Sequence, residues 1–144
     1  MNNQNKLIVY QNPATDSIEF LIPCIDNIEF IINKDIPKNN GNIVPYKIVS
    51  EIPKYFESYN LINNEIIQCK NKLYNLKKEE WRRIRKPILE KLDIEFMRAL
   101  EQNDIEKISE IKNKKKELRD ITLINIENIS SQELEELIPD ILKN

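Results

Sequence analysis

The sequence contains no histidine, one glycine and two cysteines, and each shortage excludes a kind of site. Without histidine, the chain lacks the side chain that most often acts as general acid and base near neutral pH. Cys24 and Cys69 lie far apart, outside any metal-ligand spacing, and are expected to be reduced thiols that pack as small apolar side chains. A single glycine also argues against a glycine-rich phosphate loop. The sequence therefore predicts no metal and no cofactor.

Long apolar runs and an excess charge of one sign are missing as well. No apolar stretch approaches the ~20 residues of a membrane-spanning helix, and the first residues lack the basic start and apolar run of a signal peptide. The formal net charge of −2 gives no overall attraction to nucleic acid or to anionic lipid. We therefore predict a protein of the reducing cytoplasm that does not associate with membranes.

Carboxylates and hydroxyls offer no catalytic arrangement either. Pairs such as Glu79 and Glu80 are neighbours on a predicted helix, where adjacent side chains point apart. Ser130 and Ser131 have no base beside them in the sequence. We predict that the protein is not an enzyme.

The pattern that is present is typical of an α+β protein, with a small N-terminal ββαβ unit followed by a helical hairpin and a short C-terminal helix. The N-terminal unit covers residues 1–53. Its strands are expected at residues 6–10, 17–23 and 46–50. Asp26 with Glu29 predicts a capped helix over residues 27–34, although isoleucine and phenylalanine there also favour a strand. Residues 37–45 contain the only glycine and are expected to be a loop.

Residues 54–64 are expected to be a linker between this unit and the helices. They contain three aromatic residues, Tyr55, Phe56 and Tyr59. These could form a packing cluster against the N-terminal unit or an exposed recognition patch, and the usual burial of aromatic side chains favours packing.

Residues 65–122 predict two amphipathic helices that fold back on each other at residues 102–104. Pro87 has no N–H for the carbonyl of Arg83, so a kink or a break is expected there. The apolar stripe of the first helix is expected to be Ile88, Leu92, Phe96 and Leu100, widened by Leu89 and Ala99. The second helix carries Ile108, Ile111 and Leu118 at a heptad-like spacing, with Lys115 in the remaining position.

The antiparallel pairing places opposite each other Ile88 and Leu118, Phe96 and Ile111, and Arg85 and Asp120. Arg85 then falls within the apolar face of the first helix, where a charge needs a partner. We hypothesise that Arg85 bonds Asp120 across the hairpin with its guanidinium on Trp81. The alternative is that the kink at Pro87 turns Arg85 into solvent.

Residues 123–144 predict a tail with a short helix. Ser130 with Glu133 forms a capping box for a helix over residues 131–142, which Pro139 is expected to end or bend.

Basic residues cluster near one end of the helical hairpin. They are Lys77, Lys78, Arg82, Arg83, Arg85 and Lys86, together with residues 112–116. Such a cluster can bind phosphates, but glutamates are interleaved with it, as on a solvated helix face. No base-stacking aromatic motif accompanies it. The pattern favours a solvated surface, with nucleic-acid binding as the less favoured alternative.

A W-x-x-x-R segment leads into a leucine-rich helix with an aspartate, and a second helix ends in Leu-Arg-Asp. The residues are Trp81, Arg85, Leu89, Asp93, Leu118, Arg119 and Asp120. This stretch resembles the helical region of bacteriophage tail assembly chaperones and related tail fibre assembly proteins. The opening, from LIVYQNP to VPYKIVSEIP, is similar to the N-terminal unit of small phage tail-associated proteins. The chain departs from the family pattern at Ile94, where an aromatic residue is frequent, and at residues 114–117.

The resemblance implies a non-enzymatic phage or prophage protein that assists assembly of a tail or tail fibre component through helix-mediated contacts with a protein partner. A structural tail subunit is the second interpretation, and a basic helical nucleic-acid-binding protein is the third. The seven residues that carry the resemblance are the candidate partner-binding positions. The resemblance also implies action in the host cytoplasm or on the virion. The heptad-like seam allows a coiled-coil homo-oligomer.

Overall fold

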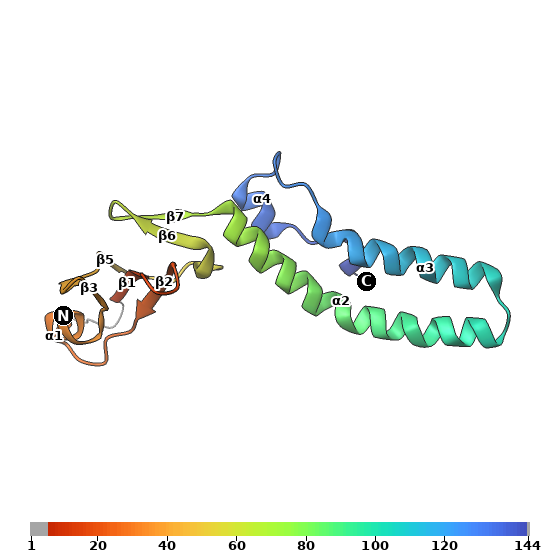
Figure 1. Cartoon of the computed structure of the whole chain (residues 1–144), viewed down its shortest axis with the longest axis horizontal. Coiled ribbons are helices and arrows are strands. Elements are labelled where there is room, and N and C mark those ends of the chain that lie inside the picture. Colours follow the sequence, from red (N-terminus) through yellow and green to blue (C-terminus); the bar gives the residue numbers. More distant parts are fainter. Residues whose placement is uncertain (1–5, 144) are drawn as a thin grey trace. The chain divides into compact units, whose positions relative to one another are not determined.

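The computed structural model describes residues 6–143 and divides into two compact units, one up to Leu73 and one from Tyr74 onward. The first unit contains the strands and helix α1, and the second is helical (Figure 1). The predicted α+β class is confirmed, with the ββαβ unit followed by a helical hairpin and a short C-terminal helix.

The first unit is built on a three-stranded antiparallel sheet with the strand order β2-β1-β5. These strands are β1 (Leu7–Asn12), β2 (Ser17–Leu21) and β5 (Tyr46–Val49). Alternation along the central strand β1 directs Ile8 and Tyr10 to one face and Val9 to the other. All three side chains are buried, which explains why this strand reads as an uninterrupted apolar run.

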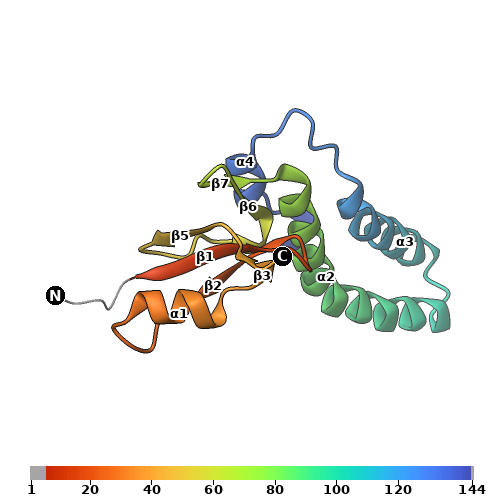
Figure 2. The ribbon, with the colours of Figure 1, turned by 60° about the vertical axis from the view of Figure 1, so that its left-hand side comes forward.

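Helix α1 (Ile28–Asp35) covers the face that carries Ile8 and Tyr10 (Figure 2). Its buried side chains Ile31 and Ile32 lie in the same apolar cluster as those two residues. The helix is capped by Asn27, whose side chain accepts the N–H of Phe30 at 3.1 Å. The predicted cap, Asp26, was therefore wrong by one residue.

The predicted loop at residues 37–45 contains a small β-hairpin. Strands β3 (Lys38–Asn39) and β4 (Asn42–Ile43) pair across a two-residue turn. Asn40 and Gly41 have φ values of 54° and 81°, as a type I′ turn requires.

The opposite face of the sheet is covered by another β-hairpin, β6 (Tyr59–Ile62) and β7 (Glu65–Gln68). Leu61 packs there with Val9 and Ile18, and the side-chain oxygen of Gln11 accepts the N–H of Leu61 at 2.9 Å. Residues 54–64 are therefore part of the first unit rather than a linker.

The turn that joins β6 to β7 lies at Asn63 and Asn64, both with positive φ. Asparagine is among the few residues that adopt this backbone at low cost, so the pair forms a turn without glycine. The helix that was predicted from residue 65 consequently begins only at Lys70.

Two of the three aromatic residues in this segment pack, as favoured. Phe56, in the 3₁₀ helix η1 (Phe56–Ser58), meets Phe20 edge-on with 5.6 Å between ring centroids. Tyr59 packs against the cluster that contains Leu61. The cysteines are both free, but Cys24 is exposed, so its predicted burial was wrong.

The second unit is a hairpin of α2 (Lys70–Glu101) and α3 (Ile105–Asp120). Helix α2 continues through Pro87 and changes direction near its middle (Figure 1). Of the two predicted alternatives, the helix is therefore kinked and not broken. Asp104 caps α3 by accepting the N–H of Lys107 at 3.0 Å. No helix within residues 6–143 is both long and apolar enough to cross a lipid bilayer.

The chain after α3 contains three short elements, η2 (Ile121–Leu123), α4 (Ser131–Glu136) and η3 (Asp140–Leu142). The predicted capping box of Ser130 and Glu133 is confirmed. The helix ends at Glu136 and not near residue 142, because Ile138 precedes Pro139 and such a position disfavours helical backbone.

A polar contact stabilises the α1 face of the sheet. The hydroxyl of Tyr10 donates to one carboxylate oxygen of Glu19 at 2.5 Å, and the amide of Asn12 donates to the other at 2.8 Å. These two hydrogen bonds lower the pKa of Glu19. Burial, and then the bond to Glu19, raises the pKa of Tyr10 to about 12.

We expect Glu19→Gln to reduce the free energy of unfolding by about 1 kcal/mol at neutral pH, since a charge-assisted pair of hydrogen bonds is weakened. Because folding lowers the pKa of Glu19, its contribution is complete above the pKa of the unfolded carboxyl group and is lost as the pH falls through the folded value. Urea unfolding followed by circular dichroism should thus show the two proteins converging in acid. A difference that persists in acid would contradict this assignment.

Candidate functional site

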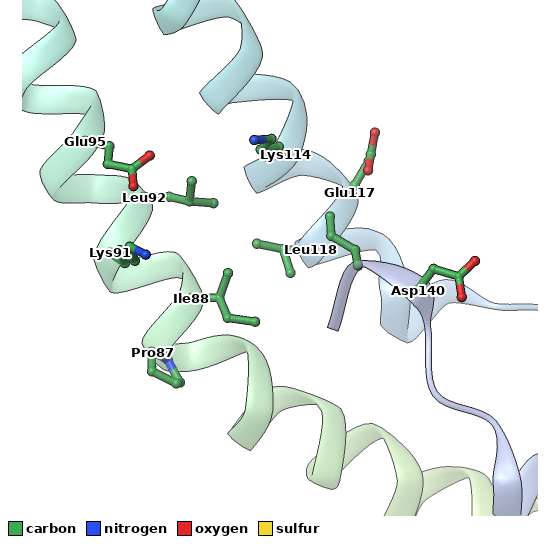
Figure 3. A pocket seen from close by; sticks show the side chains of 10 residues that line it. Pro87, Ile88, Lys91, Leu92, Glu95, Lys114, Glu117, Leu118 and Asp140 are labelled. Atoms are coloured by element: carbon green, nitrogen blue, oxygen red, sulfur yellow. The ribbon is translucent and has the colours of Figure 1, made fainter. Parts of the chain in front are cut away.

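A groove with a volume of about 740 Å³ lies between α2 and α3. Figure 3 shows Ile88 and Leu92 directed from α2 toward α3, just beyond Pro87. The apolar lining residues are Pro87, Ile88, Leu92, Leu118 and Ile141, and the charged ones are Lys91, Glu95, Lys114, Glu117 and Asp140. An apolar lining with charges of both signs suits an amphipathic protein segment and gives no general attraction to a polyanion.

The buried residues of the hairpin follow a seven-residue spacing. On α2 they include Leu92 and Ala99, and on α3 they include Ile111 and Leu118. The predicted stripe of Ile88, Leu92, Phe96 and Leu100 was wrong at its end, because Leu100 is 44% exposed. Positions four residues apart drift around a helix, so Ala99 and not Leu100 stays on the side that faces α3.

Lys77 is the most unexpected residue of the unit, since its side chain is buried although it was placed in the basic surface cluster. Its ammonium donates to the carbonyl of Glu135 at 3.0 Å and pairs with Glu80 at 3.1 Å. The ring centroid of Trp81 lies 5.9 Å away. Glu135 belongs to the last turn of α4, whose carbonyls lack partners within the helix and favour a positive charge. Lys77 therefore attaches α4 to α2.

Arg85 makes the corresponding contact with α3. One guanidinium nitrogen donates to the carbonyls of Leu118 and Arg119, at 3.0 and 3.1 Å. The predicted bond to Asp120 is absent among the described residues, and Asp120 is exposed. The hypothesis was correct that Arg85 crosses the hairpin but wrong about the acceptor.

The hydroxyl of Tyr74 holds the chain after α3. It lies 2.7 Å from the carbonyl oxygen of Thr122 and 2.8 Å from that of Ile124, and shares its single proton between them. Burial raises the pKa of Tyr74. Tyr74, Lys77 and Arg85 thus all donate from α2 to main-chain carbonyls of the segment that begins at the end of α3.

A further contact joins the two long helices near the groove. Lys115 forms an ion pair with Asp93, and its ammonium lies 5.5 Å from the ring centroid of Phe96. The Lys115 side chain is only 18% exposed, and its charge is paired with that of Asp93.

The seven predicted partner-binding residues have different surroundings, and only Leu118 lines the groove. Trp81 and Leu118 are completely buried and pack within the unit. Leu89 is half-buried, and Arg119 and Asp120 are exposed. The remaining two, Arg85 and Asp93, bind groups on α3.

Several residues of the basic cluster form contacts within the helical unit. Lys77 and Arg85 turn inward, Arg82 pairs with Glu79, and the ammonium of Lys78 lies 4.5 Å from the ring centroid of Tyr74. Within residues 6–143 no group of three or more cysteines, aspartates or glutamates is placed to hold a metal ion.

Sequence reasoning missed the internal role of Lys77 and the contribution of Ile141 to the groove. A signal for Lys77 existed, because it lies four residues before Trp81 and eight before Arg85, on the same side of the helix. No protein family, curated protein or solved structure matches the chain.

We expect Lys77→Ala to reduce the free energy of unfolding by about 2 kcal/mol or more, because it leaves a cavity at a buried position and removes the donor to the carbonyl of Glu135. Trp81 is the only tryptophan, so its fluorescence reports this unit selectively during urea unfolding. Lys86→Ala, at an exposed position of the same helix, is the matched control and should change stability by less than about 0.5 kcal/mol. Equal effects of the two changes would refute the anchoring role.

Arg85→Ala should cost about 1–2 kcal/mol, because two carbonyls at the end of α3 lose their charged donor. Asp120→Ala should leave the thermal midpoint unchanged, since its carboxylate is not the acceptor. Thermal unfolding of both variants distinguishes the two kinds of acceptor. A loss of stability in Asp120→Ala equal to that in Arg85→Ala would support the hypothesis that the carboxylate of Asp120 binds Arg85.

Proposed function

We propose that the protein is a non-enzymatic assembly factor that binds an amphipathic helix of a phage tail or tail fibre component in the groove between α2 and α3. The observation that carries this proposal is the groove itself, because its apolar lining is open between two helices. The tail and tail fibre class comes from the resemblance of the helical region.

The groove has the features that a helix-binding site needs. Ile88 and Leu92 offer apolar contact to one face of a bound helix, as in other helix-in-groove complexes. Lys91 and Lys114 carry positive charge along the groove, and Glu95 and Glu117 carry negative charge. Charges of both signs select the direction and register of a partner more than they add affinity.

A structural tail subunit is the second candidate, and one observation favours it. Ile94 and Met97 are 56% and 58% exposed on α2 and lie three residues apart, so they form a small apolar surface outside the groove. Such a surface can pack in a permanent assembly.

The test is co-expression with the proteins encoded beside this chain, followed by affinity capture and sizing. Ile88→Lys places a charge in the groove and should weaken capture of the client by about tenfold or more. Ile94→Lys adds the same charge to the same helix outside the groove and should leave capture unchanged. Trp81 fluorescence checks that both variants are folded.

Each of the other outcomes points elsewhere. Capture that survives Ile88→Lys but fails with Ile94→Lys would move the binding surface out of the groove. A protein that persists in purified tails would support the structural subunit. Binding to nucleic acid that weakens steeply as salt rises would support the third interpretation.

A further inference from the structure

The charged side chains that the two long helices contribute to the groove follow a regular order. Lys91 and Glu95 line it from α2, and Lys114 and Glu117 line it from α3. Figure 3 shows Lys91 nearer to Pro87 than Glu95 is. Because α3 runs back along α2, Glu117 is the α3 charge nearer to Pro87, and Lys114 lies toward the turn of the hairpin. Each wall therefore carries one positive and one negative charge, and the two walls carry them in opposite order.

One contact fixes which of these charges lie opposite each other. Asp93 of α2 forms an ion pair with Lys115 of α3. Two residues from this pair toward Pro87, antiparallel helices place Lys91 level with Glu117. In the other direction the remaining two charges come to about the same level, again with opposite signs. A segment in the groove thus has a positive wall on one side and a negative wall on the other, and these exchange sides about one helical turn further along.

These four charges are not used within the hairpin. Among residues 6–143, no ion pair and no side-chain hydrogen bond involves them, although they lie three or four residues apart on each helix. Another pair at such a spacing on α2, Glu79 with Arg82, is joined. Three of the four are exposed and Glu95 is half-buried. A partner that brings an opposite charge to each one adds contacts without breaking any.

The length of the groove and the spacing of its charges suit a helix. On α2 the lining runs from Pro87 to Glu95, which is about 12 Å of helix axis, or just over two turns. Residues one turn apart on a bound helix have the same spacing as Lys91 and Glu95, so each can face one of these charges.

We propose that the partner of the groove is a short amphipathic helix whose two polar flanks carry complementary charges in opposite order. The flank beside α2 has an acidic residue at Lys91 and a basic residue one turn further, at Glu95. The flank beside α3 has a basic residue at Glu117 and an acidic residue at Lys114. Aliphatic residues between the flanks fill the apolar part of the groove. This inference rests on the proposed function in one respect, that the groove binds a helix.

Such a groove distinguishes helices of identical composition. A helix with both acidic residues at one end and both basic residues at the other meets an opposite charge on one wall and a like charge on the other wall. Like charges that face each other across an interface weaken the wrong complex, so the order of the charges determines the choice of partner.

The test uses the full chain and two fluorescein-labelled peptides of about three helical turns, titrated by anisotropy. Both have leucines along one face and carry two glutamates and two lysines. The alternating peptide has the flanks described above, and the polarised peptide has both glutamates at one end and both lysines at the other. The native chain should bind the alternating peptide about tenfold more tightly, because it forms four attractive contacts where the polarised peptide forms two attractive and two repulsive ones.

Lys91→Glu combined with Glu95→Lys exchanges the charges of the α2 wall and should reverse this preference. The groove then has two acidic residues at the end near Pro87 and two basic residues at the other end, as the polarised peptide requires. Lys86→Glu combined with Glu90→Lys is the matched control, since it makes the same exchange at exposed positions of the same helix outside the groove. It should keep the native preference. Comparison between variants cancels any difference in the helicity of the free peptides.

Lys114→Glu combined with Glu117→Lys makes the corresponding exchange on α3. It provides a second variant if the first does not fold, which Trp81 fluorescence would reveal. Equal affinity of the native chain for the two peptides would overturn the proposal, as would a preference that survives either exchange or the binding of neither peptide. If capture of the client is still lost in Ile88→Lys, the groove remains the binding site and only the charge order is refuted.

Discussion

Two cations on one side of α2 hold the helical unit together by binding main-chain carbonyls at the ends of other helices. Lys77 binds the last turn of α4, and Arg85 binds the last turn of α3. Helix C-termini present carbonyls without partners and a partial negative charge, so a cation satisfies both needs at once. The burial of Lys77 is tolerable only because these acceptors, together with Glu80, surround its ammonium. The path of the chain after α3 depends on these contacts.

The same contacts explain where the groove lies. Up to Arg85, the inner side of α2 combines the buried Leu73 and Trp81 with donors that bind main-chain carbonyls from the end of α3 onward. Beyond Pro87 the inner side becomes apolar, and here Ile88 and Leu92 face the space beside Leu118. The groove therefore begins at the kink, where Pro87 and the apolar side chains that follow it on α2 line the open space. After α4, the chain continues to η3, whose Asp140 and Ile141 form part of the groove wall.

Sequence reasoning predicted those parts of the fold that depend on local signals. The alternation of β1, the capping box of Ser130 and the turn before Asp104 are of this kind. It failed where the deciding contact is distant or involves the main chain. The hairpin of β6 and β7 depends on an Asn-Asn turn and on a bond from Gln11, about 50 residues away, neither of which resembles a strand signal. The acceptors of Arg85 could not be predicted from side chains, because every residue carries a carbonyl and those in the last turn of a helix are the ones without a partner in the helix.

The residues of the candidate site also fall into two groups, those that belong to the scaffold and those that line the groove. Among the residues that carry the resemblance, Trp81 and Leu118 are buried inside the helical unit, and Arg85 and Asp93 join α2 to α3, so these four belong to the scaffold. The groove is lined largely by other residues, and two of these, Lys114 and Glu117, fall in the stretch where the chain departs from the family pattern. On the proposed function, a scaffold of the assembly-factor type would here carry a different set of charges beside its apolar lining. On that proposal, such charges would choose among partners more than they set affinity.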